Sequence, residues 1–437
     1  MQVNNQTMQT LNASIITIGD ELLIGQTIDT NSAFIAQELN KIGVWVQRRV
    51  AVGDVYHDIW NALEEEGKKS DIIIITGGLG PTADDITKPL LCEYFGGQLI
   101  VDQNVLAHVK FLFEKIYRRT GPILERNLNQ AQVPNNCIVL HNARGSAPGM
   151  WFEKMIAKEN NKVPSKTVYI SLPGVPHEMK GLVTTEVIPK LLREFSFPSI
   201  IHRTVVTSGQ GESVIAELIK DFETALPKHI KLAYLPAFGM VRLRLTASSF
   251  DKDALNTEMD FHFNQLVSLV KEYVVSESDT PLEVMLGEIL RQRKATLSTA
   301  ESCTGGYISH LITSVAGSSE YFNGGVVSYS NKLKQTILSV SPHTLKTNGA
   351  VSEETVREMV KGALDTTGSD YAVATSGIMG PGGGTEAKPV GMVWVAVGNR
   401  KSIATKEFHF RFDRERNIRQ TAHVALDFLR KFILAND

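Results

Sequence analysis

The feature that most constrains the fold is a run of four consecutive isoleucines, Ile72–Ile75. Successive side chains of a strand point to opposite faces of its sheet, so a strand that is apolar at every position must be covered on both faces. A second apolar run, 13–19, ends in a glycine. A strand pattern at 44–50 and helical periodicity at 31–42 and 57–69 alternate with these runs. The alternation predicts an α/β domain in which helices cover both faces of a parallel sheet.

Breaks in the pattern divide the chain, which has 437 residues and is too long for one typical core. The stretch 196–199 interrupts the first α/β pattern, and 276–281 has the composition of a linker. Between them the element order β-α-β-β-α is typical of a small α+β domain, for which a spacer or dimerisation role is the default. We therefore expect three domains: three-layer α/β/α at 13–195, small α+β at 196–275, and a further α/β domain at 281–437.

Charge and composition exclude several classes of protein. The net charge is −2, which gives no global electrostatic footprint for nucleic acid. Cys92, Cys137 and Cys303 are scattered without metal-ligand spacing, so a disulfide framework is excluded and a reducing cytosol is favoured. Residues 1–12 lack the apolar core of a signal peptide, and no run approaches the roughly 18 apolar residues of a membrane span. We expect a cytoplasmic protein without membrane or nucleic-acid partners.

The stretch 300–306, Ala-Glu-Ser-Cys-Thr-Gly-Gly, is the first candidate site. It follows a strand pattern at 295–299 and precedes a helical pattern at 307–315. Unpaired amide N–H groups at such a turn favour negative charge, so a nucleophile such as Ser302 would have oxyanion donors close by. The alternative is a helix N-cap, because serine and threonine are common at helix starts and glycine is common in turns.

A candidate base lies in the stretch 324–332, a strand pattern that runs into a helix. Tyr329 and Lys332 are three residues apart, which places them on one face where the helix begins. A buried lysine of lowered pKa can deprotonate a serine, and Ser-Lys pairs are variants of the catalytic triad. From spacing alone, a core aromatic and a solvated lysine explain these residues equally well.

Two glycine-containing loops of the first domain follow strands, at the edge where α/β sheets bind ligands. One is Gly19-Asp20-Glu21, and the other is the stretch 76–85, which ends in Asp84-Asp85. Two aspartates beside a glycine loop suit a hard metal such as Mg²⁺, but carboxylates at a helix start are also common for structural reasons. The stretch 172–179, Leu-Pro-Gly-Val-Pro-His-Glu-Met, returns to the same edge.

Two features of the last domain suggest phosphate binding. The loop 376–384 contains five glycines, although plain turn chemistry also explains it. Arg416 and Arg419 lie in the first turns of the closing helical pattern, where basic residues oppose the helix dipole. A nucleotide phosphate is therefore an attractive partner for Arg416.

The segment from about Pro281 onward resembles the CinA carboxy-terminal domain, a family that includes nicotinamide mononucleotide deamidases. The motifs that carry the resemblance are 300–306, 324–332, 375–383, Arg416 and Arg419. The loops of the first domain, with their Gly-Asp-Glu, Gly-Gly-x-Gly-Pro-Thr-x-Asp-Asp and Leu-Pro-Gly-x-Pro motifs, resemble the molybdopterin-binding (MoaB/MogA-like) domain. The version here is similar to the amino-terminal domain of CinA proteins.

For the carboxy-terminal domain the resemblance implies hydrolysis of nicotinamide mononucleotide to nicotinate mononucleotide and ammonia, without a cofactor. Ser302 would be the nucleophile, with Tyr329 and Lys332 as its activators. The residues implied in substrate binding are Thr304, Gly305, Gly306, Ser376, Gly377, Gly380, Arg416 and Arg419.

For the amino-terminal domain the resemblance implies cleavage of ADP-ribose to AMP and ribose 5-phosphate, with a divalent metal (Mg²⁺ or a transition metal) activating water. Asp84 and Asp85 are the metal candidates. The other site candidates are Asp20, Glu21, Gly77, Gly78, Gly80, Thr82, Pro173, Gly174 and Glu178. The whole chain would be a bifunctional hydrolase of NAD salvage and a homodimer. The alternative is a pterin- or nucleotide-binding protein with a regulatory role in competence or DNA damage.

Overall fold

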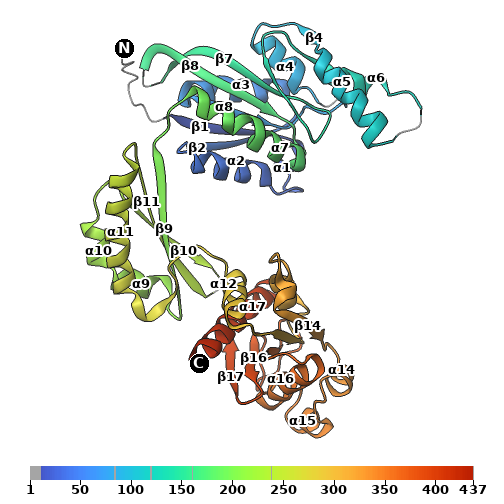
Figure 1. The fold of residues 1–437 in the computed structure, drawn as a ribbon, viewed down its shortest axis with the longest axis vertical. Coiled ribbons are helices and arrows are strands. Elements are labelled where there is room, and N and C mark those ends of the chain that lie inside the picture. Colours follow the sequence, from blue (N-terminus) through green and yellow to red (C-terminus); the bar gives the residue numbers. More distant parts are fainter. Residues whose placement is uncertain (1–10, 83–84, 119–120, 160, 238, 437) are drawn as a thin grey trace. The chain divides into compact units, whose positions relative to one another are not determined.

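A computed structural model describes residues 11–82, 85–118, 121–159, 161–237 and 239–436 (Figure 1). The chain forms two compact units, of which the first comprises Met1–Ile201 with Thr246–Met259 and the second His202–Leu245 with Asp260–Asp437. None of the helices in the described ranges is long and apolar enough to cross a membrane.

The amino-terminal domain is built on a six-stranded sheet in the order β2-β1-β3-β8-β7-β6. The strands are β1 (Asn12–Ile18), β2 (Trp45–Val52), β3 (Ile72–Thr76), β6 (Ile138–Leu140), β7 (Gly149–Lys158) and β8 (Asn161–Leu172). The first four in spatial order are parallel, as expected, but β7 runs antiparallel to both β8 and β6. The sheet is therefore mixed rather than parallel, because β7 and β8 follow each other too closely for a crossover connection.

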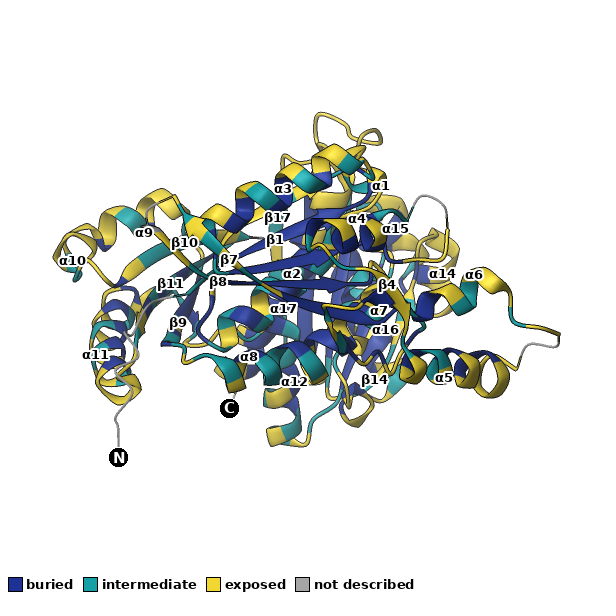
Figure 2. Ribbon diagram, turned by 90° about the horizontal axis from the view of Figure 1, so that it is seen from above, coloured by how far each residue is buried: buried dark blue, intermediate teal, exposed yellow. Residues whose placement is uncertain are grey.

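Helices cover both faces of this sheet, and the isoleucine run shows how. Ile72 and Ile74 pack into one hydrophobic cluster, whereas Ile73 and Ile75 pack into another on the opposite face. The helices on the first face are α2 (Thr30–Lys41), α7 (Pro176–Leu182) and α8 (Ile188–Glu194), and those on the second are α3 (Tyr56–Lys69) and α4 (Thr87–Tyr94). The strands accordingly appear dark blue between helices with exposed outer faces (Figure 2). The predicted three-layer α/β/α architecture is confirmed.

Shorter elements complete this domain. They are α1 (Asp20–Leu23), β4 (Leu99–Val101), α5 (Gln103–Phe111), α6 (Glu125–Leu128) and β5 (Gln132–Pro134), with β4 and β5 forming a two-stranded antiparallel sheet.

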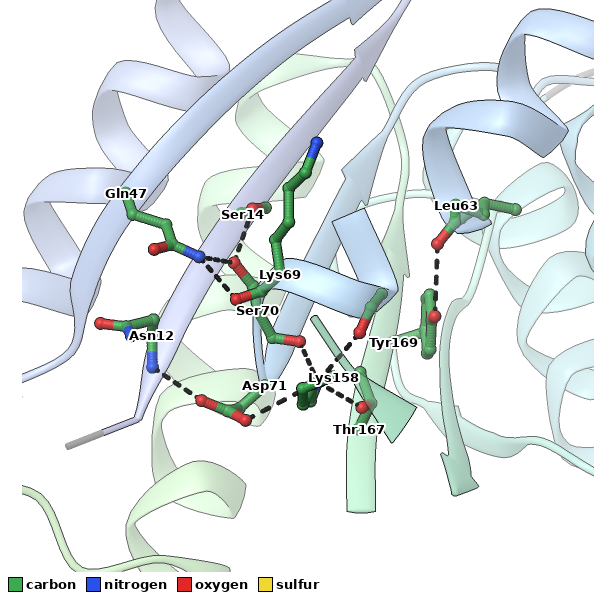
Figure 3. A network of polar contacts seen from close by, with 11 residues as sticks. Asn12, Ser14, Gln47, Leu63, Lys69, Ser70, Asp71, Lys158, Thr167 and Tyr169 are labelled. Atoms are coloured by element: carbon green, nitrogen blue, oxygen red, sulfur yellow. Dashed lines mark hydrogen bonds and ion pairs between the residues drawn. The ribbon is translucent and has the colours of Figure 1, made fainter. Parts of the chain in front are cut away.

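A polar network closes the amino ends of β1 and β3 (Figure 3). The Lys158 ammonium donates to the carbonyl oxygen of Gly67 at 3.0 Å and to the Thr167 hydroxyl at 2.6 Å, and it pairs with Asp71 at 3.7 Å. Burial lowers the pKa of Lys158. Because Asp71 also accepts the N–H of Asn12 at 3.1 Å, the network ties this end of the sheet together. In open α/β sheets ligands bind at the opposite, carboxyl edge.

The middle of the chain forms a four-stranded sheet in the order β10-β11-β9-β12. Its elements are β9 (Ser199–Ser208), α9 (Glu212–Leu218), α10 (Lys220–Ala225), β10 (Lys231–Ala237), β11 (Met240–Ser249), α11 (Lys252–Leu269) and β12 (Val274–Ser276). This arrangement confirms the expected small α+β fold.

The carboxy-terminal domain has a five-stranded sheet in the order β14-β13-β15-β16-β17. Its strands are β13 (Leu297–Glu301), β14 (Phe322–Val327), β15 (Tyr371–Gly377), β16 (Met392–Asn399) and β17 (Ile403–His409). Helices α12 (Leu282–Arg293), α13 (Tyr307–Thr313) and α17 (Arg414–Ala435) pack on one face, and α16 (Glu353–Thr367) packs on the other. Two short helices, α14 (Asn331–Thr336) and α15 (Pro342–Thr347), follow β14. The second α/β domain is therefore confirmed.

Candidate functional site

Ser302 lies one residue beyond the end of β13, where its main-chain N–H donates to the carbonyl oxygen of Thr375 in the neighbouring β15 at 3.0 Å. The hydroxyl of Ser302 contacts the side chain of a lysine. The Nζ atom of Lys334 lies 2.9 Å from Ser302 Oγ and 2.7 Å from the main-chain oxygen of Ser328. A serine hydroxyl and a lysine amine thus come together at the carboxyl edge of the sheet, 32 residues apart in the sequence.

The environment of Lys334 favours its neutral form. The side chain is 1% exposed, and burial lowers the pKa of its ammonium group. The local structure places it there because Ser330 caps α14, accepting the N–H of Leu333 at 3.2 Å on its hydroxyl, so that Lys334 falls in the second half of this short helix. A lysine with lowered pKa in contact with a hydroxyl has the geometry of a nucleophile and its base.

The lysine in contact with Ser302 is therefore Lys334 and not Lys332. Lys332 is exposed on the same helix. The expectation assumed that Tyr329 already belongs to the helix, but α14 begins at Asn331, and a three-residue spacing counted from Tyr329 does not put Lys332 on the inner face. Tyr329 is 63% exposed, and its hydroxyl accepts a hydrogen bond from Arg414 Nη2 at 2.9 Å.

The turn after Ser302 is held by the buried carboxylate of Glu301. It accepts the main-chain N–H groups of Gly306, Ile308 and Ser309 at 2.8–3.0 Å, and also the Ser309 hydroxyl at 2.6 Å. Gly306 adopts a left-handed conformation with φ of 97°. These amides were expected to point outward as oxyanion donors. They point at Glu301 instead, because an uncapped helix start buried in protein needs acceptors of its own.

Cys303 is not poised for nucleophilic attack. Its side chain is buried, and burial raises the pKa of the thiol to about 12. Thr304, a predicted substrate-binding residue, is also buried, and its hydroxyl shares a 2.8 Å hydrogen bond with that of Thr375. Gly305 has φ of 61°, and its N–H donates to the carbonyl oxygen of Ser302 at 3.3 Å.

The glycine loop after β15 meets the start of α17 through Arg414. Arg414 Nη1 donates to the carbonyl oxygen of Gly380 at 3.0 Å, while its Nη2 holds Tyr329. Gly380 has φ of 83° and lies on the loop that Gly377 begins. The hydroxyl of Ser376 donates to the carbonyl oxygen of Ala350 at 2.7 Å, so its contact is with the protein.

The two predicted phosphate-binding arginines lie elsewhere on α17. Both line a cavity of about 380 Å³ together with Pro236, Ala237, Asp413 and Glu415. The guanidinium of Arg416 lies 4.1 Å from the centre of the Phe412 ring, and Arg419 pairs with Glu415. Ser302 is not among the residues that line this cavity.

The amino-terminal domain has a cavity of about 230 Å³ at the carboxyl edge of its sheet. Its lining includes Glu21, Asn31, Thr76 and Gly174. The amide nitrogen of Asn31 donates to the carbonyl oxygen of Gly174 at 2.7 Å and to the Thr76 hydroxyl at 3.3 Å. The Thr76 hydroxyl in turn donates to the carbonyl oxygen of Pro173 at 3.0 Å. The loops after β1, β3 and β8 are therefore brought together here.

The remaining predicted residues of this domain that the structure describes are not among those that line the cavity. Asp20 begins α1, and its Oδ1 accepts the N–H of Asp54 at 3.2 Å. Gly77 has φ of 120°, and a Cβ atom there would lie 2.2 Å from the carbonyl oxygen of Ile18, so glycine is required. Glu178 accepts a 2.6 Å hydrogen bond from the amide of Asn142, and burial raises the pKa of its carboxyl group.

The two predicted metal ligands, Asp84 and Asp85, have different outcomes. Asp84 lies outside the described residues. The carboxylate of Asp85 accepts the N–H groups of Gly80 at 2.7 Å and Thr82 at 2.9 Å, as well as the Thr82 hydroxyl. Both of its oxygens are thus engaged in shaping the loop. Within the described part of the chain, no three His, Cys, Asp or Glu side chains cluster in a way that could hold a metal ion.

Three residues were missed by sequence reasoning: Lys334, Arg414 and Asn31. Ser330 could have pointed to Lys334. A serine N-cap at 330 places the start of the helix at 331, and with that start the inward-facing lysine is Lys334 rather than Lys332. Arg414 stands directly after Asp413, which caps α17 by accepting the N–H of Arg416 at 2.9 Å, and this helix start was visible in the sequence. Asn31 offered no signal beyond its place after the first loop.

Three protein families match successive parts of the chain. Residues 14–193 match the family described as "Probable molybdopterin binding domain", residues 202–276 the "Damage-inducible protein CinA KH domain", and residues 279–433 the "CinA C-terminal domain".

Relatives extend the similarity over the whole chain. A CinA-like protein of Flavobacterium psychrophilum is 45% identical over 98% of this chain and 99% of its own length. A CinA-like protein of Cytophaga hutchinsonii is 45% identical over 96% and 97%, respectively. Among solved structures, the competence/damage inducible protein CihA of Agrobacterium tumefaciens is 38% identical, covering 34% of this chain and 92% of its own, with a TM-score of 0.34. The chain therefore belongs to the CinA family, with a molybdopterin-binding-like domain, a KH-like domain and a CinA carboxy-terminal domain in that order.

Proposed function

We propose that the carboxy-terminal domain is an amidohydrolase that converts nicotinamide mononucleotide and water to nicotinate mononucleotide and ammonia. The observation that carries the proposal is the 2.9 Å contact between the buried Lys334 nitrogen and the Ser302 hydroxyl. The choice of substrate rests on the CinA carboxy-terminal family, which includes such deamidases.

In this proposal the neutral amine of Lys334, which burial favours, accepts the proton of the Ser302 hydroxyl. Ser302 Oγ bonds to the carboxamide carbon, and the protonated Lys334 returns the proton to the amide nitrogen as the C–N bond breaks and ammonia leaves. A water molecule then attacks the acyl-enzyme. Lys334 takes a proton from that water and passes it to Ser302 Oγ, which releases the carboxylic acid.

The substrate phosphate needs a cation at the same edge of the sheet. We assign this role to Arg414, because it joins Tyr329 to the glycine loop after β15, the strand next to the one that carries Ser302. A guanidinium suits phosphate because it offers several parallel donors. Replacing Arg414 with methionine should raise the KM for the mononucleotide more than it lowers kcat.

The direct test is incubation of the purified protein with nicotinamide mononucleotide and measurement of released ammonia. Ser302→Ala should lose nearly all activity, because no other described hydroxyl contacts Lys334 Nζ. Absence of ammonia from the wild-type protein, or full activity in Ser302→Ala, would refute the proposal.

A second activity is proposed for the amino-terminal domain: cleavage of ADP-ribose to AMP and ribose 5-phosphate with a divalent metal. The supporting observation is the 230 Å³ cavity, which Thr76, Asn31 and Glu21 line with polar groups. The described residues do not by themselves form a metal site, so no chemical step is assigned to the ion. Release of AMP that a chelator abolishes would support the activity. Binding of ADP-ribose without cleavage would favour the alternative, a regulatory nucleotide-binding protein.

The middle domain is proposed not to bind nucleic acid. KH domains clamp the nucleic-acid backbone with a Gly-x-x-Gly loop. The segment 202–276 contains glycine at 209, 211 and 239, and therefore has no Gly-x-x-Gly sequence. Single-stranded RNA and DNA should not bind the purified protein at physiological salt in an electrophoretic shift assay.

A further inference from the structure

Ser328, at the end of β14, is a buried polar residue whose side chain the proposed mechanism does not use. It directly follows the strand and is 0% exposed. Its main-chain oxygen accepts a hydrogen bond from Lys334 Nζ at 2.7 Å. Among the described residues, however, its hydroxyl oxygen has no hydrogen-bond partner. Buried hydroxyls are normally paired, so an unpaired one beside the proposed base requires an explanation.

The pairing of β13 with β14 places Ser328 beside Ser302. The two strands are parallel, and the last residues of each, Glu301 and Val327, lie opposite one another. The ladder continues past this pair, because the N–H of Ser328 donates to the carbonyl oxygen of Glu301 at 2.8 Å. Ser302 and Ser328 are therefore the next pair in register on two neighbouring strands.

The two serines also share the face of the sheet on which the amine of Lys334 lies. Two residues before them, Ala300 and Val326 belong to the hydrophobic cluster on the face that α16 covers. Side chains alternate between the two faces along a strand, so Ser302 and Ser328 lie on the same face as Ala300 and Val326. Lys334 reaches this face from α14, because its Nζ atom contacts the Ser302 hydroxyl. The unpaired hydroxyl of Ser328 is therefore on the same side of the sheet as the Lys334 amine.

Protonation of Lys334 creates a donor for which the structure shows no acceptor. A lysine ammonium donates three hydrogen bonds. In the described part of the chain, Lys334 Nζ has two hydrogen-bond partners, Ser302 Oγ and the main-chain oxygen of Ser328. A buried ammonium with an unpaired N–H group is costly, and the proposed transfer of the Ser302 proton produces this ammonium. A third acceptor would therefore stabilise the product of that transfer.

We propose that the Ser328 hydroxyl is a positioning group for Lys334, because its oxygen accepts the third N–H of the ammonium that forms when Ser302 loses its proton. Rotation about the Cα–Cβ bond of Ser328 moves this oxygen between staggered positions, while the main-chain oxygen keeps its hold on Nζ. Ser328 neither gains nor loses a proton in this step. It stabilises the charged lysine more than the neutral one, since hydrogen bonds to charged groups are the stronger. The inference rests on the proposed Ser302–Lys334 mechanism and deepens it.

The test compares the pH dependence of ammonia release from nicotinamide mononucleotide in full-length wild-type protein, Ser328→Ala and Ser328→Thr. Ser328→Ala removes the acceptor. Its kcat/KM at the high-pH plateau should fall by about 10-fold, and the midpoint of the profile should move to lower pH, because the ammonium loses a hydrogen bond that the neutral amine needs less. Ser328→Thr keeps a hydroxyl and should restore both quantities. A midpoint that stays unchanged in Ser328→Ala, or moves to higher pH, would overturn the proposal.

Ser298→Ala controls for the loss of any buried serine hydroxyl from this sheet. Ser298 lies in β13 and is fully buried, but its hydroxyl shares a 2.7 Å hydrogen bond with that of Ser369. This variant should lose stability and keep the wild-type midpoint. A midpoint that moves as far in Ser298→Ala as in Ser328→Ala would assign the effect to loosened packing and would count against the proposal.

The other ionisable groups near Lys334 are the same in all of these variants. The Cys303 thiol acts on Lys334 through its charge, and burial raises the pKa of that thiol to about 12. The Glu301 carboxylate is turned to the main-chain N–H groups of Gly306, Ile308 and Ser309. A midpoint that moves only in Ser328→Ala therefore reports the Ser328 hydroxyl.

A direct titration of Lys334 separates this inference from the proposed function. In full-length protein with isotope-labelled lysine, nuclear magnetic resonance follows the protonation of each lysine, and Lys334→Met identifies the signal of Lys334. The pKa of Lys334 should be lower in Ser328→Ala than in the wild type, whether or not ammonia is released. A wild-type protein that releases no ammonia but shows this difference would refute the proposed deamidation and keep the contact. An active protein with equal Lys334 pKa values in both forms would do the reverse.

Discussion

At the scale of single residues, two lysines of one short helix differ completely in environment. Lys332 is exposed, whereas Lys334 is buried against Ser302. Replacing each with methionine, which keeps the length of the side chain, therefore isolates the buried amine. Lys334→Met should lower kcat for ammonia release by about 100-fold or more, the usual contribution of a general base, and Lys332→Met should stay near wild type. Similar losses in both variants would assign the effect to the helix rather than to the amine.

The protonation state of Lys334 predicts a pH profile. Burial lowers the pKa of Lys334 below its ordinary value of 10.5. The proposed mechanism uses the neutral amine as the base. The rate kcat/KM should therefore rise with pH and level off, with a midpoint below 10.5. The contribution of Lys334 to folding stability also rises with pH. Between the folded and the unfolded pKa values the unfolded chain binds more protons than the folded chain, so a rise in pH favours the folded state. A rate that falls over the same range would contradict a neutral lysine base.

The thiol next to Ser302, the proposed nucleophile, offers a matched control for Ser302→Ala. Burial keeps the pKa of Cys303 near 12, so its thiolate is scarce at neutral pH. Cys303→Ala should keep most of the ammonia release, although the small cavity it leaves lowers the melting temperature slightly. An inactive Cys303→Ala protein with an unchanged melting temperature would mean that the sulfur takes part in the chemistry.

At the scale of elements, the turn between β13 and α13 depends on one carboxylate. Glu301→Gln replaces an acceptor oxygen with an NH₂ group that faces other donors, so buried N–H groups lose their partner. The free energy of unfolding should fall by about 1–3 kcal/mol, and kcat should fall because the turn also positions Ser302. Glu320→Gln is the control, because that carboxylate pairs with Arg291 on the surface. Urea denaturation of both variants measures their free energies of unfolding. Equal values would contradict this role of Glu301.

The helices and strands were easier to predict than the contacts between side chains of different elements. The Ile72–Ile75 run and the strand–helix alternation were enough for the three-layer architecture, because period-2 burial depends on local sequence. They did not reveal that β7 runs antiparallel, since the direction of a strand depends on the length of its connection. Ser302 was visible as a hydroxyl at a strand end. The serine cap at 330 indicated where α14 starts, but the contact of Lys334 with Ser302 also depends on how β13 and β14 pair, which local sequence does not show.

At the scale of the whole molecule, the family assignment covers three domains, but the core of the carboxy-terminal domain extends beyond its own segment. Val206 in β9 and Val275 in β12 are buried in the same hydrophobic cluster as Leu286 and Leu429. The Ser208 hydroxyl also donates to the carboxylate of Asp427 in α17 at 3.0 Å. The linker at 276–281 separates two domains in the sequence, but the hydrophobic core of the second unit contains residues from both sides of it.

A truncation series tests this packing. A fragment of residues 281–437 should fold and release ammonia, because Ser302 and Lys334 both lie within it. It should nevertheless be less stable than a fragment of residues 202–437, on the order of 3 kcal/mol, since each buried valine contributes about 1.5 kcal/mol or more. Chemical denaturation gives the free energies of unfolding, and Val206→Ala in the longer fragment should reproduce part of the difference. Equal free energies for the two fragments would show that the middle domain does not stabilise the carboxy-terminal domain. An inactive but folded short fragment would place part of the proposed site outside residues 281–437.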